Sequence, residues 1–239
     1  MGELRWGGRR EFGPYSALLA ALVLFIALMP ILDNGGIGSL LIRIGFDVVL
    51  LAGLGVARNS RRFLTIAVVL VGANLAVQWL AHLLTGNEES RQLLRLLFGA
   101  VYLSYLVVVL VRALARHEDA TIDTVLGGIN VYLLLALAFM QMHALAEWFE
   151  PGSYVHGGVA LSDPASGQHG ALQTTLTYFS FTTLTTLGYG DISPAKPVAQ
   201  FLCAAEALIG QLYVAIFIGG LVALRIGGRQ RASSDERSP

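Results

Sequence analysis

The chain has 239 residues, of which 55% are hydrophobic and 13% are charged, and its formal net charge at pH 7 is zero. Soluble domains carry charge on about a quarter of their residues, so this composition indicates a membrane protein. The basic residues are scattered and form no broad cationic face, which excludes nucleic acid as a partner. The single cysteine, Cys203, excludes an internal disulfide framework and a cysteine-based metal site.

Six segments are apolar enough to cross the hydrocarbon core of a bilayer, which takes about 20 helical residues. They are expected near Tyr15 to Leu32, Ile37 to Val56, Phe63 to Leu84, Leu93 to Leu114, Val125 to Phe149 and Val198 to Leu224. The expected fold class is therefore an all-α membrane protein. Its expected parts are an N-terminal segment 1–14, a four-helix membrane domain 15–117, a two-helix domain 118–228 with a long internal loop, and a short polar tail 229–239 without fixed structure.

Arginines determine the expected orientation, because positive residues gather on the cytoplasmic side. Four groups fall on one side of a six-span topology: Arg5, Arg9 and Arg10; Arg58, Arg61 and Arg62; Arg112 and Arg116; and Arg225, Arg229 and Arg231. The opposite side holds only Arg91, Arg95 and Lys196. We therefore expect a multi-pass protein of the cell (plasma or inner) membrane with both termini in the cytoplasm.

The stretch from Leu172 to Pro194, between the fifth and sixth spans, is too short in apolar residues to cross the membrane. We expect it to enter the membrane and return, first as a helix to about Thr185 and then as irregular backbone. Gly188 and Gly190 allow positive φ, so the segment after the helix can turn its carbonyl groups toward one axis. Irregular backbone at this depth is tolerated where it lines a wet cavity, and a pore satisfies that condition.

The residues at this point read Thr185-Thr186-Leu187-Gly188-Tyr189-Gly190-Asp191. This string resembles the selectivity filter of the potassium channel superfamily, with leucine at position 187 where the common form has valine. The motif also follows a short amphipathic helix and lies between the last two spans, on the side assigned as extracellular. The resemblance covers about residues 119–228, strongly at the filter, and it covers the first four spans only by their layout.

The resemblance implies a potassium-selective channel in which backbone carbonyls replace the water shell of K⁺. The implied ion-binding residues are Thr186, with its hydroxyl, Leu187, Gly188, Tyr189 and Gly190, and the first four of these carbonyl groups would bind K⁺. The implied supporting residues are Thr185, Asp191, Tyr178, Phe179 and Glu206. Asp191 is expected at the outer mouth, where bonding to the pore helix is favoured over direct ion contact.

One chain carries one such loop, whereas a closed ring of carbonyl groups needs four, so the expected unit is a homotetramer. The expected partners are K⁺ and membrane lipids, with no cofactor besides the permeant ion. A weakly selective cation channel and a non-conducting regulatory subunit remain alternatives, although Tyr189 favours selectivity. The sequence has no His-Glu-x-x-His pair, no Gly-x-Ser-x-Gly elbow and no thiol with a plausible base, so we expect no enzyme activity.

The sixth span offers candidates for gating. Gly210 and the pair Gly219 and Gly220 can act as hinges, or they can let neighbouring helices approach closely. Glu206 is an acid within an apolar helix, and such residues are functional candidates. It can be a hydrogen-bonded buttress of the pore helix, which we favour, or a group whose protonation controls conduction.

The first four spans resemble a voltage sensor in layout only. The fourth span has Arg91 and Arg95 near its outer end but no basic residue from Leu96 to Val111, which does not favour strong voltage sensing. Arg43 and Asp47 are four residues apart on one helix face and are expected to form a pair, with Arg95 as another candidate partner of Asp47. The polar positions Asn74, Gln78 and His82 are spaced by four and are expected to face the helix bundle.

Three histidines, His143, His156 and His169, are expected near the outer face. A proton or zinc sensor is one interpretation, and titration of histidines in a loop without a specific role is the favoured one. No metal site is predicted besides the K⁺ filter.

Overall fold

The structure of the chain is a computed structural model that describes residues 14–32, 37–57, 61–84, 88–115, 122–163 and 172–235. Its elements in chain order are α1 Pro14–Leu32, α2 Ile37–Ala57, α3 Arg61–Leu84, α4 Glu88–Leu114, α5 Ile122–Phe149, β1 Tyr154–His156, β2 Val159–Ala160, α6 Leu172–Leu184, β3 Ile192–Pro194 and α7 Pro197–Asp235. Outside the described residues lie the N-terminal segment to residue 13, Arg58, Arg116, His169 and residues 236–239.

Six of the helices, α1 to α5 and α7, are long and apolar enough to cross a membrane. The predicted spans are confirmed as helices, and the chain is a multi-pass membrane protein. The predicted tail without fixed structure is wrong as far as Asp235, because α7 continues to that residue. Arginine, glutamine and alanine follow Leu224, and these residues favour a helix, while the next proline is Pro239.

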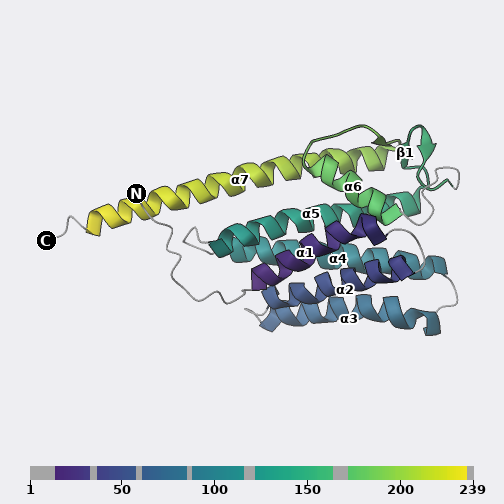
Figure 1. Cartoon of the computed structure of the whole chain (residues 1–239), viewed down its shortest axis with the longest axis horizontal. Helices are drawn as coiled ribbons and strands as arrows, with labels where there is room; N and C mark the ends of the chain where they lie inside the picture. Colours follow the sequence, from purple (N-terminus) through teal and green to yellow (C-terminus); the bar gives the residue numbers. More distant parts are fainter. Residues whose placement is uncertain are drawn as a thin grey trace.

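Helices α1 to α5 form a bundle, and the long helix α7 runs along α5 and continues beyond the bundle (Figure 1). Helix α4 contacts α5, α3 and α2, and α1 contacts both α2 and α5. The short helix α6 contacts α5 on one side and α7 on the other. Helix α5 is therefore the shared wall between the four-helix part and the part that carries the predicted filter.

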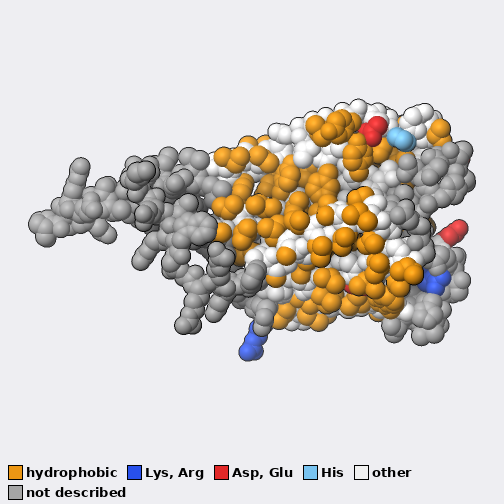
Figure 2. Space-filling view, in the orientation of Figure 1, with side chains coloured by type: hydrophobic (Ala, Val, Ile, Leu, Met, Phe, Trp, Pro, Cys, Tyr) orange, Lys and Arg blue, Asp and Glu red, His pale blue; other side chains and the backbone are white. Residues whose placement is uncertain are grey.

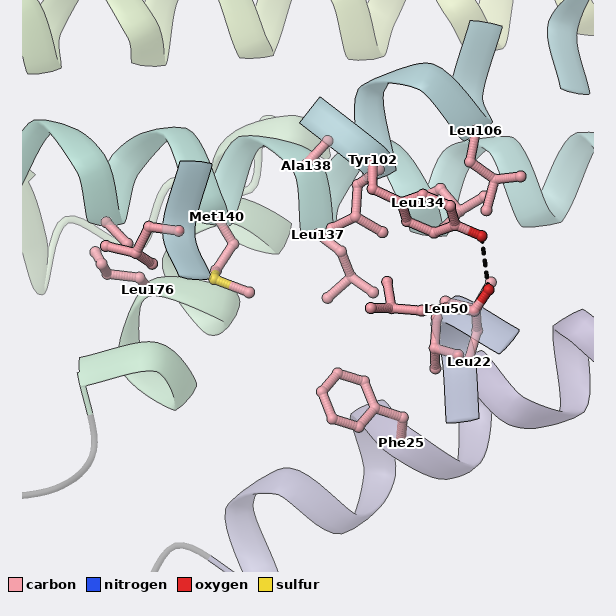
Figure 3. Packing of buried hydrophobic residues seen from close by; sticks show 14 of the residues in the cluster. Leu22, Phe25, Leu50, Tyr102, Leu106, Leu134, Leu137, Ala138, Met140 and Leu176 are labelled. Atoms are coloured by element: carbon pink, nitrogen blue, oxygen red, sulfur yellow. Dashed lines mark hydrogen bonds between the residues drawn. The ribbon is translucent and has the colours of Figure 1, made fainter. Parts of the chain in front are cut away.

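The hydrophobic core lies where α1, α2, α4 and α5 meet. Its fully buried side chains include those of Leu22, Leu50, Tyr102, Leu106 and Leu134. Figure 3 shows these residues around a hydrogen bond in which the Tyr102 hydroxyl donates to the Leu50 carbonyl oxygen at 2.6 Å. This bond satisfies a phenol group that would otherwise be buried without a partner. It also ties α4 to α2 in the centre of the bundle.

Asp47 in α2 is buried, and its Oδ2 accepts hydrogen bonds from Gln78 Nε2 at 2.8 Å and Trp79 Nε1 at 3.0 Å. The predicted pair with Arg43 is wrong: no ion pair links these two described residues, and Arg43 is exposed while Asp47 faces α3. Asp47 therefore joins α2 to α3 through neutral donors, which avoids burying a second charge. Gln78 faces the bundle as predicted.

A cavity of about 540 Å³ lies among the transmembrane helices beside these residues. Its lining includes Arg43, Arg95, Asn74 and Gln141 together with apolar side chains. The side-chain oxygens of the buried residues Asn74 and Gln141 have no hydrogen-bond partner among the described residues. Polar groups of this kind allow a cavity to hold water. The predicted inward position of Asn74 is confirmed, whereas the His82 side chain lies outside the described residues.

A three-stranded sheet in the order β2-β1-β3 lies between α5 and α7 in the sequence. Strand β1 pairs with β2 through the two-residue turn Gly157-Gly158, whose φ angles are +57° and +85°. Both positions need the left-handed region, and two consecutive glycines supply it without steric cost. Strand β1 also pairs with β3, with Val155 opposite Ser193. This pairing joins the segment after α5 to the segment after the predicted filter.

Hydrophobic side chains cover the middle of the face shown in Figure 2, and the basic side chains coloured there stand near the two ends of the helices. The exposed apolar side chains come from several helices, and they include Val23, Val69, Val101 and Ile216. A soluble monomer rarely exposes so large an apolar surface. This distribution matches helices surrounded by hydrocarbon.

The Tyr102–Leu50 hydrogen bond leads to a testable prediction. Replacing Tyr102 by phenylalanine removes a buried donor and is expected to lower the free energy of unfolding by about 1 kcal/mol. The matched control is Tyr105→Phe, because the Tyr105 hydroxyl donates to the Phe63 carbonyl at 2.9 Å in a partly buried position. Thermal unfolding of the purified protein in detergent should show the larger loss for Tyr102→Phe. Equal melting temperatures for the two variants would contradict the assigned role of the bond.

Candidate ion-conducting site

Helix α6 has 13 residues and is too short to cross a membrane, since it rises by only about 20 Å. Its buried side chains include Leu176, Phe179 and Ser180, which face α5 and α7. Thr182 and Leu184 are buried near its end. The helix is thus enclosed on both sides by longer helices, and its C-terminal end carries the predicted filter.

The backbone amide groups after α6 fold back on the helix. Thr186 N donates to Thr183 O at 2.9 Å, and Leu187 N and Gly188 N both donate to Thr182 O, at 2.8 Å and 3.2 Å. Free carbonyl groups at a helix end need partners of this kind. Because the amide groups point toward the helix, the carbonyl groups of the same segment are directed elsewhere.

The backbone from Thr186 to Gly190 alternates in conformation. Thr186, Gly188 and Gly190 have φ angles of +58°, +55° and +78°, whereas Leu187 and Tyr189 do not have positive φ. In a regular strand, successive carbonyl groups point to opposite sides. Alternation between left-handed and other conformations brings them toward the same side. Thr186 adopts the left-handed region although it is β-branched, which costs about 1–3 kcal/mol and marks functional sites. The tertiary structure therefore imposes this conformation.

The predicted filter segment, Thr186 to Gly190, is exposed in the single chain. Leu187 and Tyr189 are 56% and 67% exposed, although both side chains are large and hydrophobic. Among the described residues, the carbonyl oxygens of Thr186, Leu187, Gly188 and Tyr189 accept no hydrogen bond. A row of oxygen atoms without partners can bind a cation, and it needs further protein around it if it lies within a membrane.

Two tyrosine rings support the segment from the outer side. The rings of Tyr178 and Tyr189 are stacked, with centroids 6.5 Å apart and an angle of 5° between their planes. Partial burial and the neighbouring Asp191 raise the pKa of Tyr178, so its hydroxyl keeps a proton at neutral pH and can donate to the Asp191 carboxylate. Phe179, another predicted supporting residue, is buried beside Tyr154 and His143 and does not reach the filter segment itself.

Glu206 of α7 is fully buried and faces α6. Its Oε1 lies 2.5 Å from Ser180 Oγ, and its Oε2 lies 2.8 Å from His143 Nε2 of α5. The structure therefore places Glu206 in contact with the middle of α6, the position that the buttress interpretation requires. Thr185, by contrast, bonds within its own segment, because its hydroxyl donates to Phe181 O at 2.7 Å.

Gly210 lies one turn after Glu206, and α6 meets α7 closely there. A Cβ atom at Gly210 would lie 2.3 Å from the Leu184 carbonyl oxygen, so no side chain fits. This contact supports the packing interpretation of Gly210. At Gly219 and Gly220 a Cβ atom would meet nothing within 4 Å in the described part of the chain. Close packing therefore does not explain these two glycines, and their role as a hinge stays a prediction.

Gln211, which was not among the predicted site residues, contacts the predicted filter segment directly. Its Nε2 donates to Thr186 Oγ1 at 3.0 Å, and the Thr186 hydroxyl donates in turn to Thr185 O at 2.7 Å. These two hydrogen bonds hold Thr186, the first residue in the row of carbonyl groups. The sequence could have indicated Gln211, because a polar residue inside an apolar span is a functional candidate.

His143 is not a loop residue, so that part of the histidine interpretation is wrong. It lies inside α5, is fully buried, and its Nδ1 is 2.6 Å from the Tyr154 hydroxyl. The helix α5 extends to Phe149, and β1 folds back over its end to cover the ring. His156 is exposed on β1, and His169 lies outside the described residues. The described histidines therefore do not form one cluster.

Comparison with known proteins gives a match at this site. Residues 166–224 match the family model described as Ion channel. The matched residues contain α6, the predicted filter segment and the whole candidate span in α7. A segment of 45 residues is also 47% identical to a protein called two pore potassium channel c from Oryza sativa subsp. japonica. The alignment covers 19% of this chain and 10% of the rice protein. No solved structure matches the chain significantly.

Both matches support a relationship with the potassium channel superfamily. The family match does not include α1 to α4, so it concerns the helix-loop-helix part of the protein. The chain is thus a multi-pass membrane protein in which residues 166–224 are similar to an ion-channel family.

The positive φ at Gly188 leads to a second prediction. Gly188→Ala is expected to abolish K⁺ selectivity or conduction, because an alanine with φ near +55° costs about 1–2 kcal/mol and disturbs the carbonyl row. The matched control is Gly157→Ala, whose φ is +57° in the β1–β2 turn. Neither Cβ atom would meet a neighbour within 4 Å, so the local strain is equal. Ion flux from reconstituted protein should be lost only in Gly188→Ala. Normal flux through that variant would remove the filter assignment.

Proposed function

We propose that this chain is one subunit of a potassium-selective channel that conducts K⁺ passively across the membrane. The observation that carries the proposal is the filter segment, in which φ is positive at Thr186, Gly188 and Gly190 and the intervening carbonyl groups have no partner among the described residues. The sequence of this segment resembles the potassium filter, and the family match covers it. The proposal includes no enzyme activity and no cofactor.

In the proposed mechanism, K⁺ loses its water shell and binds the carbonyl oxygens of Thr186, Leu187, Gly188 and Tyr189 in successive sites. The Thr186 hydroxyl provides the innermost ligand, and its orientation depends on Gln211. The negative end of the α6 dipole, near Leu184, lowers the energy of a cation on the inner side of the filter. Asp191, which is exposed, increases the local concentration of cations at the outer side.

We propose that four copies surround the pore. A single row of carbonyl groups cannot enclose an ion, whereas four related rows form a closed ring. Helix α7 supports the proposal, since only 11% of its span is buried in the single chain compared with 61% of the span in α5. The exposed side chains of Leu187 and Tyr189 would be covered by neighbouring copies. The remaining apolar surface would contact membrane lipids.

The proposed orientation places both termini in the cytoplasm of a cell membrane, with the filter opening to the outside. Arg61, Arg62 and Arg112 then lie on the cytoplasmic side, whereas Arg91, Arg95 and Lys196 lie outside. Helix α4 has no basic residue between Leu96 and Val111, so the proposal does not include strong voltage sensing.

The function is tested by the reversal potential of purified protein in a bilayer, with K⁺ on one side and Na⁺ on the other. We expect a reversal close to the K⁺ limit, because the carbonyl ring selects the larger dehydrated ion. Recording at several voltages and two pH values covers the common opening stimuli. Equal permeability would replace the proposal by a weakly selective cation channel. Absence of current under every condition would favour the regulatory-subunit alternative.

The assembly is tested by the native mass in mild detergent. We expect four copies of the 25.6 kDa chain in one particle. A protein without the filter motif but of similar size provides the calibration for bound detergent. A stable monomer that still conducts K⁺ would contradict the closed carbonyl ring.

A further inference from the structure

Four buried side chains form a continuous chain of contacts behind the filter segment. Tyr154 of β1, His143 of α5, Glu206 of α7 and Ser180 of α6 all have zero exposed surface. The Tyr154 hydroxyl lies 2.6 Å from His143 Nδ1, and His143 Nε2 lies 2.8 Å from Glu206 Oε2. Glu206 Oε1 contacts Ser180 Oγ, which contacts the Ala136 carbonyl oxygen at 2.6 Å. The chain thus links four elements.

The Ser180 hydroxyl determines where one proton lies. It has a single hydrogen atom and two oxygen neighbours, Ala136 O and Glu206 Oε1, at 2.6 Å and 2.5 Å. The Ala136 carbonyl can only accept, so it takes the serine hydrogen. The short contact between Ser180 and Glu206 then needs a hydrogen from Glu206 Oε1. A carboxylic acid supplies this hydrogen, whereas an ionised carboxylate would face an oxygen lone pair.

The rest of the chain agrees with a neutral acid. With the proton on Oε1, Glu206 Oε2 is a carbonyl oxygen and accepts from His143 Nε2–H. His143 Nδ1 then has no hydrogen and accepts from the Tyr154 hydroxyl. Burial raises the pKa of Tyr154, so this hydroxyl keeps its proton. Every contact therefore has one donor and one acceptor, in one direction from Tyr154 to Ala136.

An ionised pair fits these contacts less well. If His143 were charged, its Nδ1–H would donate to Tyr154, and the tyrosine hydrogen would need an acceptor that the described residues do not provide. Other polar groups near the chain do not supply this acceptor. Both Glu147 oxygens already accept hydrogens, from the backbone amides of Gly152 and Tyr154 at 2.9 Å and 3.0 Å, and Cys203 of α7 and Tyr132 of α5 lie near the chain.

We propose that Glu206 is a neutral carboxylic acid with its proton on Oε1, and that the chain from Tyr154 to Ala136 fixes α7 against the helix that carries the filter. His143 is then a positioning residue for the filter, although it lies in α5. This role rests on the proposed function, whereas the protonation of Glu206 does not.

The geometry explains why this contact positions the filter. Ser180 and Leu184 are one helical turn apart on α6, and Glu206 and Gly210 are one turn apart on α7. Glu206 contacts Ser180, and Gly210 contacts Leu184. Two contacts one turn apart set both the rotation and the height of α6 relative to α7. The segment from Thr185 onward starts from this position.

The test uses Glu206→Gln, because a carboxamide has the same shape and the same donor and acceptor as the neutral acid. Its oxygen can accept from His143, and its amide group can donate to Ser180. We expect an unchanged melting temperature and an ion current within about twofold of the original protein. Glu206→Ala is expected to lower the melting temperature and to lose the ion current, because it leaves His143 and Ser180 without partners.

Glu147→Gln provides the matched control, since it is also a buried glutamate in this region. Both Glu147 oxygens accept backbone hydrogens, and a carboxamide would direct its own N–H group at one of these donors. We therefore expect Glu147→Gln to lower the melting temperature while Glu206→Gln does not. The opposite order would overturn the proposal, since an ionised Glu206 would lose its charge pair with His143.

Infrared difference spectra between the original protein and Glu206→Gln provide a readout that does not require conduction. A band of a protonated carboxylic acid that disappears in Glu206→Gln is the expected result. Loss of a carboxylate band instead would overturn the proposal. If the acid band is present but the original protein carries no K⁺ current, the protonation of Glu206 stands and the proposed function fails.

Discussion

The position of α6 between α5 and α7 is the constraint on which the rest of the site depends. The helix has only 13 residues, so its position relative to α7 decides where the backbone that follows it begins. Glu206 and Gly210 of α7 set this position through Ser180 and Leu184. The amide groups of Leu187 and Gly188 then bond to Thr182, which leaves the carbonyl groups available to a cation. A change at the α6–α7 contact would therefore alter the filter without touching it.

The outer sheet extends this constraint to the segments on both sides of the filter. Strand β1 follows α5, and β3 follows the filter segment, so their pairing joins the beginning and the end of the loop. Tyr154 in β1 also reaches His143 below it. The predicted filter segment is thus held on one side by the α6–α7 contacts of Ser180 and Leu184 and on the other by the β1–β3 pair. This arrangement stabilises strained backbone at Thr186, which an isolated loop would not keep.

The four-helix part differs from the channel part in how it buries its polar groups. Asp47 Oδ2 accepts hydrogen bonds from Gln78 and Trp79, and amide oxygens line a cavity that can hold water. In the part made of α5, α6 and α7, polar side chains instead form a linear chain of hydrogen bonds from Tyr154 to Ser180. Helix α5 takes part in both: Gln141 faces the cavity, and His143, two residues later, faces the filter helix.

The sequence by itself determined the spanning helices and the positive φ at Gly188 and Gly190, because both depend on local properties. A span needs a continuous apolar stretch, and the segment after Thr185 needs glycines that accept positive φ at positions 188 and 190. Only the tertiary structure decided the partners of Asp47, the burial of His143 and the contact between Gln211 and Thr186. Each depends on which helix lies opposite, and residues far apart in the chain meet without leaving a periodic signal. The strands were likewise not predicted, because they have only two or three residues and β3 pairs with β1 across a long loop.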